Sequence, residues 1–312
     1  MKRFLFLLLI FTCFFSCHKE GKMPPIDNLV DLDGTVVNDS SITFTERFLL
    51  SAKILTPTLL DLNKPVVICV HGFSASTFEW IEFRDFATSL GTFNTSIVLL
   101  GGHGTNYEDF KKASWEDWQN PIIEEYNKLV NLGYTNINIA GSSTGAPLIL
   151  NMIYENKVNT SNLKNLFLID PIIVPSNKTL SLVKVVGPLL SYTETTFTPG
   201  EVRFWYRFRP YQALNELNQL TKKVRKKIEK GITLPQGVKL QVYKSEKDDA
   251  ADPISAVIIE KGITLNDQSP ISVQMISSNL HVFTRLSGRT GVIGDDVKNQ
   301  ENTFQSILQK IN

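Results

Sequence analysis

The sequence predicts an α/β fold in which a mostly parallel central sheet is flanked by helices. Two observations support this. Short apolar runs rich in β-branched residues recur along the chain, and stretches with apolar residues at steps of three and four lie between them. Near-continuous apolar strands are typical of parallel sheets covered on both faces, and their alternation with helices favours the same class. The 312 residues, 42% hydrophobic and with a net charge of +1, suit a globular domain and give no sign of nucleic-acid binding.

Seven segments are predicted to be strands, and helical patterns lie between and after them. The strands are expected within 47–55, 65–73, 96–104, 137–143, 163–171, 238–245 and 271–278. The helices are expected over 76–90, over 114–132, from Pro253 onward and over 295–312. Ser114 and Asp117 form a capping pair at the start of the second helix, and Gly133 is a stop signal at its end. Pro121 lies inside this helix and predicts a kink or a restart there.

Residues 174–236 interrupt the alternation and are predicted to form a small helical cap over one end of the sheet. The segment lies between two core strands, is rich in aromatic residues and has a helical pattern in its second half. As a lid, it would line an acyl pocket with aromatic side chains; alternatively, these side chains pack the cap onto the body. Its basic run, 222–230, either faces anionic headgroups or is a solvated helix face. The aromatic residues are Phe197, Phe204, Trp205, Tyr206, Phe208 and Tyr211.

The first 16 residues are predicted to be a signal peptide, because the positive start "MKR" precedes the apolar run "FLFLLLIFTCFF", which is too short to span a bilayer of roughly 30 Å. Ser16 directly before Cys17 resembles a bacterial lipobox, although Phe14 stands where the commonest lipobox has leucine. The resemblance implies that Cys17 is diacylated and anchors an exported protein to a bacterial membrane, on the periplasmic side or at the cell surface. Residues 17–43 would then be a tether and 44–312 the folded domain. The alternative is a secreted soluble protein with a left-over Cys17.

The segment "NINIAGSSTGAPLILNM", residues 136–152, joins an apolar strand to an apolar helix through five small residues. Its G-x-S-x-G spacing, with Ser143 at the centre, is typical of a nucleophile held on a sharp strand-to-helix turn. Gly141 and Gly145 allow strand and helix to approach closely, and such a turn strains the backbone of the serine. The same spacing also occurs in plain Gly/Ser loops, so the prediction depends on partners for Ser143.

His281 is the predicted general base for Ser143. It follows the last predicted strand, and the two histidines that end earlier strands, His71 and His103, precede the serine in the chain. His71 is expected to orient its own loop. A zinc site of His71 and His103 is the competing interpretation, but it lacks the usual ligand spacing and a third acidic or thiol ligand. Cys69 lies on an apolar strand and is expected to be a core residue.

The carboxylate that orients His281 is expected directly after the strand 238–245. A carboxylate is needed there because it selects the imidazole tautomer and stabilises the imidazolium formed during the reaction. Three aspartates follow the strand: Asp248, Asp249 and Asp252. Asp252 fits the N-cap of the helix that starts at Pro253. Asp248 is closest to the strand end and is preferred, while Asp249 stays open as the alternative.

An oxyanion formed during attack needs two backbone N–H donors. One is expected at Thr144, directly after the nucleophile. The other is expected at Phe73, in the loop after the strand that ends "VHGF", where Gly72 lets the backbone approach the substrate.

Six segments together resemble the α/β-hydrolase superfamily and, within it, the carboxylesterase and monoacylglycerol-lipase group, which shares features with serine aminopeptidase-like hydrolases. They are "VHGFSAS" (70–76), "LLGGHGTN" (99–106), "SWEDW" (114–118), "GSSTGA" (141–146), "SEKDDAADPISA" (245–256) and "LHVFTRL" (280–286). The resemblance implies the α/β-hydrolase fold with a small helical cap, and cleavage of a carboxylic ester through an acyl-enzyme without cofactor or metal. Its spacing places the triad carboxylate five residues before a proline, at Asp248. Thr144 stands where many relatives have Met, Leu or Gln.

The combined prediction is a membrane-tethered serine esterase for short-to-medium acyl esters or monoacylglycerol-like lipids. Its expected partners are the ester substrate and a membrane surface. Two alternatives stay open: a catalytically idle α/β-hydrolase fold that serves as a surface binding lipoprotein, and an amide or thioester hydrolase with the same triad chemistry. The complete set of Ser143, Asp248 and His281 argues against the first, since a binding protein gains nothing from all three.

Overall fold

The computed structural model describes residues 23–26, 57–177 and 191–312, and six of their strands form one parallel sheet. The signal peptide, Cys17, the tether apart from residues 23–26, and the predicted strand 47–55 lie outside the described residues. The strand order in the sheet is β10-β8-β4-β3-β1-β2. The bounds are β1 Val66–Val70, β2 Asn94–Val98, β3 Ile137–Ser142, β4 Leu163–Ile169, β8 Lys239–Ser245 and β10 Ser272–Ile276.

The parallel register brings the carboxyl ends of these strands to one edge of the sheet. Val66 of β1 pairs with Asn94 of β2 and with Ile137 of β3, and both pairings continue in register to Val70, the last residue of β1. Every residue of β1 and β3 is buried. This burial on both faces explains why these strands are almost continuously apolar in the sequence.

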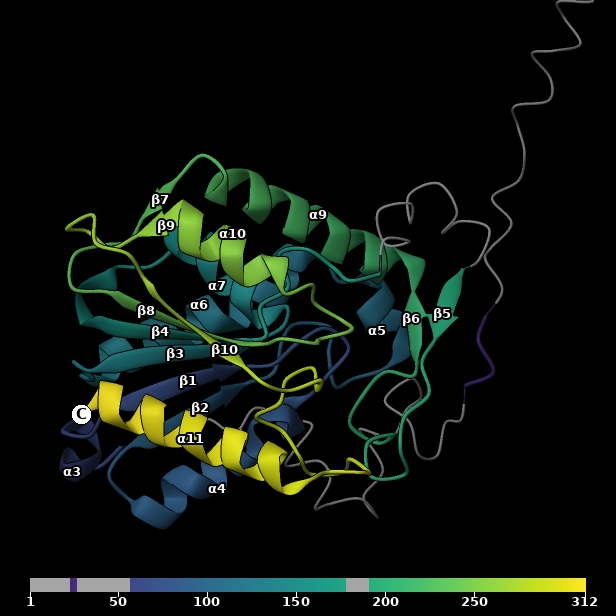
Figure 1. Cartoon of the computed structure of the whole chain (residues 1–312), viewed down its shortest axis with the longest axis horizontal. Helices are drawn as coiled ribbons and strands as arrows, with labels where there is room; N and C mark the ends of the chain where they lie inside the picture. Colours follow the sequence, from purple (N-terminus) through teal and green to yellow (C-terminus); the bar gives the residue numbers. More distant parts are fainter. Residues whose placement is uncertain (1–22, 27–56, 178–190) are drawn as a thin grey trace, which may run out of the picture.

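Helices cover both faces of the sheet (Figure 1). On one face, α6, α7, α9 and α10 pack over a core that includes Val66, Ile68 and Val70 of β1. On the other face, α4 and α11 pack over a second core that includes Val67 and Cys69. Alternate residues of one strand therefore serve opposite cores. The bounds are α4 Ile81–Leu90, α6 Trp115–Leu132, α7 Gly145–Tyr154, α9 Tyr211–Ile228, α10 Ile254–Gly262 and α11 Gly294–Ile311.

Helix α6 has the predicted caps. Ser114 and Asp117 form a reciprocal capping box, and Gly133 ends the helix with a φ of +100°. The helix runs through Pro121 as one element, so the predicted restart does not occur. Shorter elements connect the main ones: α3 Leu59–Leu62, η4 Thr77–Trp80, α5 Tyr107–Lys112, η5 Thr160–Asn162, β7 Ile232–Thr233 and β9 Ile263–Thr264.

The segment between β4 and β8 contains a small antiparallel pair followed by the long helix α9. Strand β5 (Tyr192–Glu194) pairs with β6 (Phe208–Pro210), and both lie beyond one end of the central sheet in Figure 1. The backbone N–H of Tyr206 donates to the carbonyl of Ser74 at 2.8 Å, which ties this segment to the loop after β1. Tyr206 is buried and stacks on Phe110 of α5, and the buried ring of Phe208 packs against Tyr192 of β5. No helix within the described ranges is long and apolar enough to cross a membrane.

Candidate active site

Ser143 lies at the turn between β3 and α7. Its φ is +47°, in the left-handed region that residues with a side chain rarely adopt. Two hydrogen bonds hold this backbone: the N–H of Ser143 donates to the carbonyl of Ile169 at 2.9 Å, and its carbonyl accepts from the N–H of Ile172 at 3.2 Å. A strained residue that its neighbours over-determine is typical of a functional position.

Glycines on both sides of Ser143 make this turn sterically feasible. A Cβ atom at Gly141 would lie 2.4 Å from the Cδ1 atom of Ile149, and one at Gly145 would lie 2.6 Å from the carbonyl oxygen of Val70. The close approach of strand and helix therefore requires the two glycines of the G-x-S-x-G spacing, as predicted. It brings the first turn of α7 directly against the end of β1.

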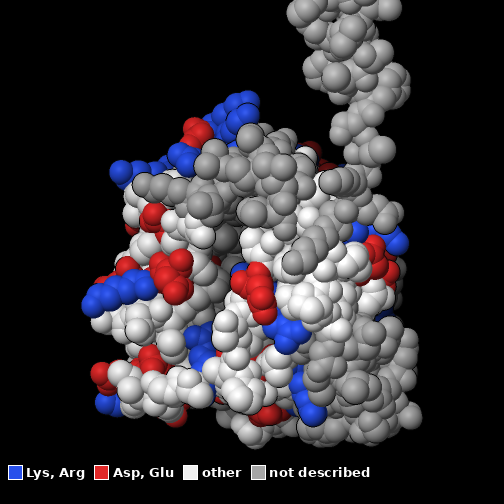
Figure 2. All heavy atoms as spheres, turned by 90° about the vertical axis from the view of Figure 1, so that its right-hand side faces the viewer, with Lys and Arg blue, Asp and Glu red and all other residues white. Residues whose placement is uncertain are grey.

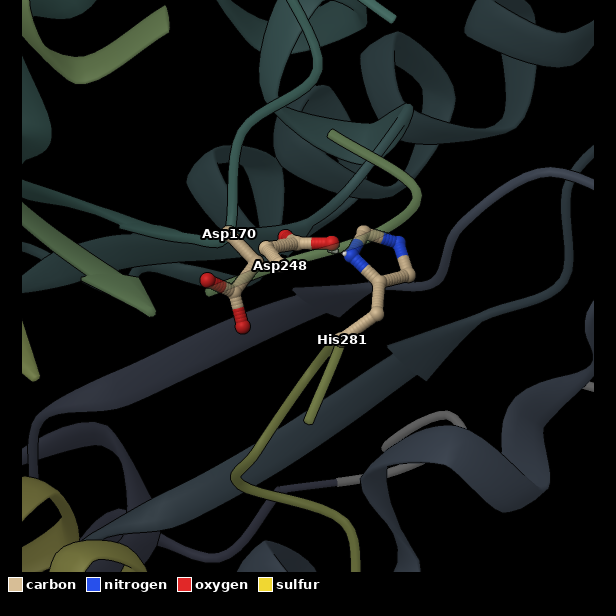
Figure 3. A group of neighbouring side chains, drawn as sticks. All are labelled: Asp170, Asp248 and His281. Atoms are coloured by element: carbon tan, nitrogen blue, oxygen red, sulfur yellow. Dashed lines mark hydrogen bonds and ion pairs between the residues drawn. The ribbon is translucent and has the colours of Figure 1, made fainter. Parts of the chain in front are cut away.

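His281, in the loop after β10, forms a hydrogen bond with Asp248, in the loop after β8 (Figure 3). The Nδ1 atom of His281 lies 2.8 Å from Oδ2 of Asp248. The other oxygen, Oδ1, accepts hydrogen bonds from the N–H groups of Ala250 (2.8 Å) and Ala251 (3.0 Å), so both lone-pair sets of this carboxylate are used. This arrangement leaves Nε2 as the nitrogen of His281 that is free to exchange a proton.

The two other aspartates have different places. Asp249 is exposed at the rim of the cavity that Ser143 and His281 line. Asp252 Oδ1 accepts a hydrogen bond from the N–H of Ile254 at 2.9 Å, directly before α10, but the N-cap of this helix is Pro253 and not the predicted Asp252. The geometry thus pairs His281 with Asp248, while the catalytic role of this pair stays a prediction.

A buried lysine connects Asp248 to a second carboxylate. Lys244, on β8, is fully buried; its Nζ atom lies 3.2 Å from Oδ1 of Asp170 and donates to Oδ2 of Asp248. Asp170 also accepts from the N–H groups of Ser245 (2.7 Å) and Phe283 (3.3 Å). Asp170, Asp248 and His281 are the one group of metal-ligand type found within the described residues, with donor atoms within 4.8 Å (Figure 3). The ammonium group of Lys244 supplies positive charge between its two carboxylates.

These contacts set the charge state of the two aspartates. Burial raises the pKa of Asp248, but the hydrogen bond and charge of His281 and the charge of Lys244 outweigh it, and the pKa falls to about 2. For Asp170, burial outweighs the attraction of Lys244 and raises the pKa. Asp248 is therefore ionised at neutral pH, as an orienting carboxylate must be.

The predicted oxyanion donors, the N–H groups of Phe73 and Thr144, lie next to Ser143. Both residues line the cavity together with Ser143, and neither backbone N–H is used in a hydrogen bond to another described residue. The buried Glu79 of η4 holds the turn before Phe73: its Oε1 atom accepts from the N–H of Gly72 at 2.7 Å and from the hydroxyl of Ser142. A Cβ atom at Gly72 would lie 2.9 Å from the Cβ of Ser143, so this turn also requires glycine.

His71 and His103 hold loops together. The Nε2 atom of His71 accepts from the N–H of Leu100 at 3.1 Å, and that of His103 accepts from the N–H of Ser74 at 3.3 Å. Burial lowers the pKa of both imidazoles, that of His103 well below its ordinary value. Since the Nδ1 atoms lie 2.9 and 3.1 Å from the carbonyls of Gly72 and Gly101, both rings are neutral connectors between loops, and the zinc interpretation has no support.

One cavity of about 840 Å³ contains the predicted site. Ser143 is 5% exposed at its wall, and the side chain of His281 is 24% exposed. Within the described part of the chain, no hydrogen bond joins Ser143 to His281. Catalytic hydrogen bonds are often long or poorly aligned until a substrate binds. Phe197, Trp205 and Tyr211 of the predicted cap line the cavity, whereas Tyr206 stacks on Phe110 of the body, so each interpretation of the cap aromatics holds for part of the set. Figure 2 shows the side of the molecule on which β5 and β6 lie in Figure 1. Outside the grey atoms, this surface is mainly uncharged, with separate basic and acidic side chains.

Several residues of the site were not foreseen in the sequence. A sequence pattern could have identified Lys244 and Glu79, since each is a charged residue inside an otherwise apolar segment. Asp170 ends a buried strand, as catalytic residues of parallel sheets often do. Arg285 and Arg289 gave no local signal, because the loop after β10 has no periodic pattern.

No family model matches the chain. In sequence, the chain is 24% identical over 233 residues to a thermostable monoacylglycerol lipase from Bacillus sp. (strain H-257). The aligned region covers 71% of this chain and 85% of that protein.

Solved structures share the fold. One reported for the metagenome-derived lipolytic enzymes LipS and LipT has a TM-score of 0.65 at 14% identity, covering 84% of this chain and 98% of the other. The monoacylglycerol lipase of Paleococcus ferrophilus has a TM-score of 0.60 at 14% identity, covering 84% and 97%. The six-stranded parallel sheet, the serine turn between β3 and α7 and these similarities lead to one conclusion: the chain has the α/β-hydrolase fold and resembles its esterase and monoacylglycerol-lipase members.

Proposed function

We propose that the chain is a serine hydrolase that cleaves carboxylic esters of the short-to-medium acyl or monoacylglycerol type. The observation that carries the proposal is the meeting of three chain segments at one cavity: Ser143 on its strained turn, and His281 hydrogen-bonded to Asp248. The sequence similarity to a monoacylglycerol lipase supports the substrate class.

In the proposed reaction, Oγ of Ser143 attacks the ester carbonyl carbon while Nε2 of His281 takes the hydroxyl proton. The carbonyl oxygen becomes an oxyanion and accepts hydrogen bonds from the N–H groups of Phe73 and Thr144. Collapse of this intermediate breaks the bond to the alcohol oxygen, which takes the proton from His281 and leaves as the free alcohol. Water, deprotonated by His281, then attacks the carbonyl carbon of the acyl-serine. The bond between this carbon and Oγ of Ser143 breaks, Oγ takes the proton back from His281, and the acid is released. Asp248 keeps the imidazole oriented and stabilises its charged form.

The test is hydrolysis of a chain-length series of nitrophenyl esters by the full chain in detergent, with Ser143→Ala alongside. Turnover and labelling by a fluorophosphonate are expected for the wild type and are lost in the variant, while the circular dichroism spectrum is unchanged. Ser89→Ala, at an exposed position of α4, is the matched control. Turnover that persists in pure Ser143→Ala would disprove the serine mechanism.

We also propose that lipid on Cys17 tethers the protein to a bacterial membrane after export. The support is the sequence alone: a positive start, an apolar run and a small residue before Cys17. Cys17→Ser is expected to release the protein from the membrane fraction. Membrane association that is unchanged in this variant would exclude the lipid anchor.

A further inference from the structure

Two arginines from the loop between β10 and α11 line the same side of the cavity as His281. Arg285 is 6% exposed, and its charge is compensated: Nη2 lies 2.6 Å from Oε1 of Glu201. Its guanidinium carbon lies 4.5 Å from the ring centre of Trp205. Arg285 is therefore accounted for by contacts within the protein.

Arg289 has no such compensation. Its Nη2 atom donates to the main-chain carbonyls of His281 and Val282, which are neutral groups. Within the described residues no carboxylate forms an ion pair with Arg289, and its buried Nε–H has no acceptor there. The guanidinium group is thus held at the cavity wall by neutral acceptors only. Arg289 as a whole is half-buried, and a buried N–H donor without an acceptor is unfavourable unless a ligand supplies one.

Three carboxylates, Glu201, Glu79 and Asp170, act electrostatically on Arg289 without forming an ion pair with it. Glu201 binds Arg285 and Asp170 binds Lys244, while Glu79 accepts from the N–H of Gly72 and the hydroxyl of Ser142 and does not contact Arg289. Burial, and then the positive charge of Arg285, lowers the pKa of Arg289 to about 10, so the group is still charged at neutral pH. Arg289 is therefore a charged guanidinium group at the cavity wall that no carboxylate of the described residues contacts directly.

The position of Arg289 selects one end of the substrate. In the proposed reaction His281 returns its proton to the alcohol oxygen, so the alcohol lies on the His281 side of the cavity. Arg289 binds the main chain of His281 and lies on that side, whereas the oxyanion donors at Phe73 and Thr144 belong to the loops after β1 and β3. An anion at Arg289 would therefore belong to the alcohol part of the ester.

We propose that the site takes esters whose alcohol part carries an anionic carboxylate or phosphate group, and that Arg289 binds this group. The inference rests on the proposed ester hydrolysis and adds the charge of the alcohol to it. A guanidinium group suits this task, because its planar N–H donors match the oxygens of both anions.

The experiment compares two esters that differ only in the charge of the alcohol. They are 4-butanoyloxybenzoate, whose leaving group carries a carboxylate, and 4-butanoyloxybenzamide, whose leaving group is neutral. The measured quantity is the ratio of kcat/KM for the charged ester to kcat/KM for the neutral one, so any general damage to the triad cancels.

Arg289→Gln is expected to lower this ratio about tenfold or more, the size of a lost charge-assisted hydrogen bond. Arg289→Lys should keep part of it. Arg203→Gln is the matched control, because Arg203 is exposed and does not line the cavity. An unchanged ratio in Arg289→Gln overturns this inference while leaving ester hydrolysis intact. Failure of the wild type to cleave either ester overturns the proposed function itself.

A measurement on the wild type covers the case in which the variant does not fold. The alcohol product 4-hydroxybenzoate is expected to inhibit hydrolysis of a neutral nitrophenyl ester more strongly than 4-hydroxybenzamide does. The difference should shrink at high salt, because the attraction is between charges. Equal inhibition by the two products at low salt would overturn the inference.

Discussion

Lys244 donates a hydrogen bond from its buried ammonium group to Asp248, the same carboxylate that accepts from His281. The ammonium group also contacts Asp170, so one cation lies between two buried acids. Without it, two carboxylates would share a low-dielectric site, and one of them would have to take up a proton. The arrangement therefore allows Asp248 to be ionised beside a second acid.

Lys244→Met is expected to lower the free energy of unfolding by about 3–5 kcal/mol, since it leaves buried carboxylates without their cation. The double variant Lys244→Met/Asp170→Asn should recover part of this loss, because only one carboxylate then stays buried. Urea denaturation at pH 7 measures both changes. A loss under about 1 kcal/mol in the single variant would show that the ion pairs do not support the fold.

Asp248→Asn is expected to lower kcat for ester hydrolysis by about 10³-fold, because an amide neither fixes the required tautomer of His281 nor stabilises its charged form. Asp249→Asn is the matched control and should retain near wild-type turnover, since Asp249 is exposed at the rim. Steady-state kinetics on a nitrophenyl ester compares the two variants. Loss of activity in Asp249→Asn alone would reverse the assignment.

The pKa of Asp248 also predicts how stability depends on pH. Its folded-state pKa of about 2 lies below the ordinary value of ~3.9, so the unfolded chain binds the proton more tightly. Ionised Asp248 stabilises the fold fully above pH ~5 by about 2 kcal/mol, and this contribution is lost as pH falls through 4 towards 2. The stability difference between wild type and Asp248→Asn should therefore narrow between pH 6 and pH 3. A constant difference across this range would contradict the lowered pKa.

The steric demand at the serine turn can be tested with two glycines. Gly145→Ala would place a methyl group 2.6 Å from the carbonyl oxygen of Val70, and it is expected to destabilise the fold by about 1–3 kcal/mol. Gly294→Ala, at the start of α11, meets no described atom within 4 Å and should change stability by less than about 0.5 kcal/mol. Thermal unfolding of both variants gives the comparison; equal melting temperatures would rule out a tight turn.

Glu79 is expected to act by positioning the turn that carries the Phe73 donor. Glu79→Ala removes the acceptor for the N–H of Gly72 and should lower kcat about tenfold with KM changed less than about threefold. Glu79→Gln keeps an acceptor oxygen and should recover most of kcat. If the two variants lose kcat equally, or if KM carries the change, the acceptor at this position does not serve the transition state.

The strand segments could be predicted closely because burial on both faces leaves an unbroken apolar signal. All six strands of the central sheet fall within or beside their predicted segments; the segment 96–104 is the least accurate, since its strand is Asn94–Val98 and a turn follows. The antiparallel pair β5 and β6 was not predicted. Its strands have three residues each, too few for an alternation to appear.

The sequence by itself determined the serine turn, the α/β alternation and the order in which Ser143, Asp248 and His281 occur, because these depend on local sterics, on apolar periodicity and on the ends of strands. Only the tertiary structure decided which charges meet. Lys244 and Asp170 are 74 positions apart, and Glu201 and Arg285 are 84 apart. No local pattern links such residues, since the packing of separate strands and loops at one edge of the sheet brings them together. The same packing places Arg289 beside His281, where its acceptors among the described residues are the neutral carbonyls of His281 and Val282.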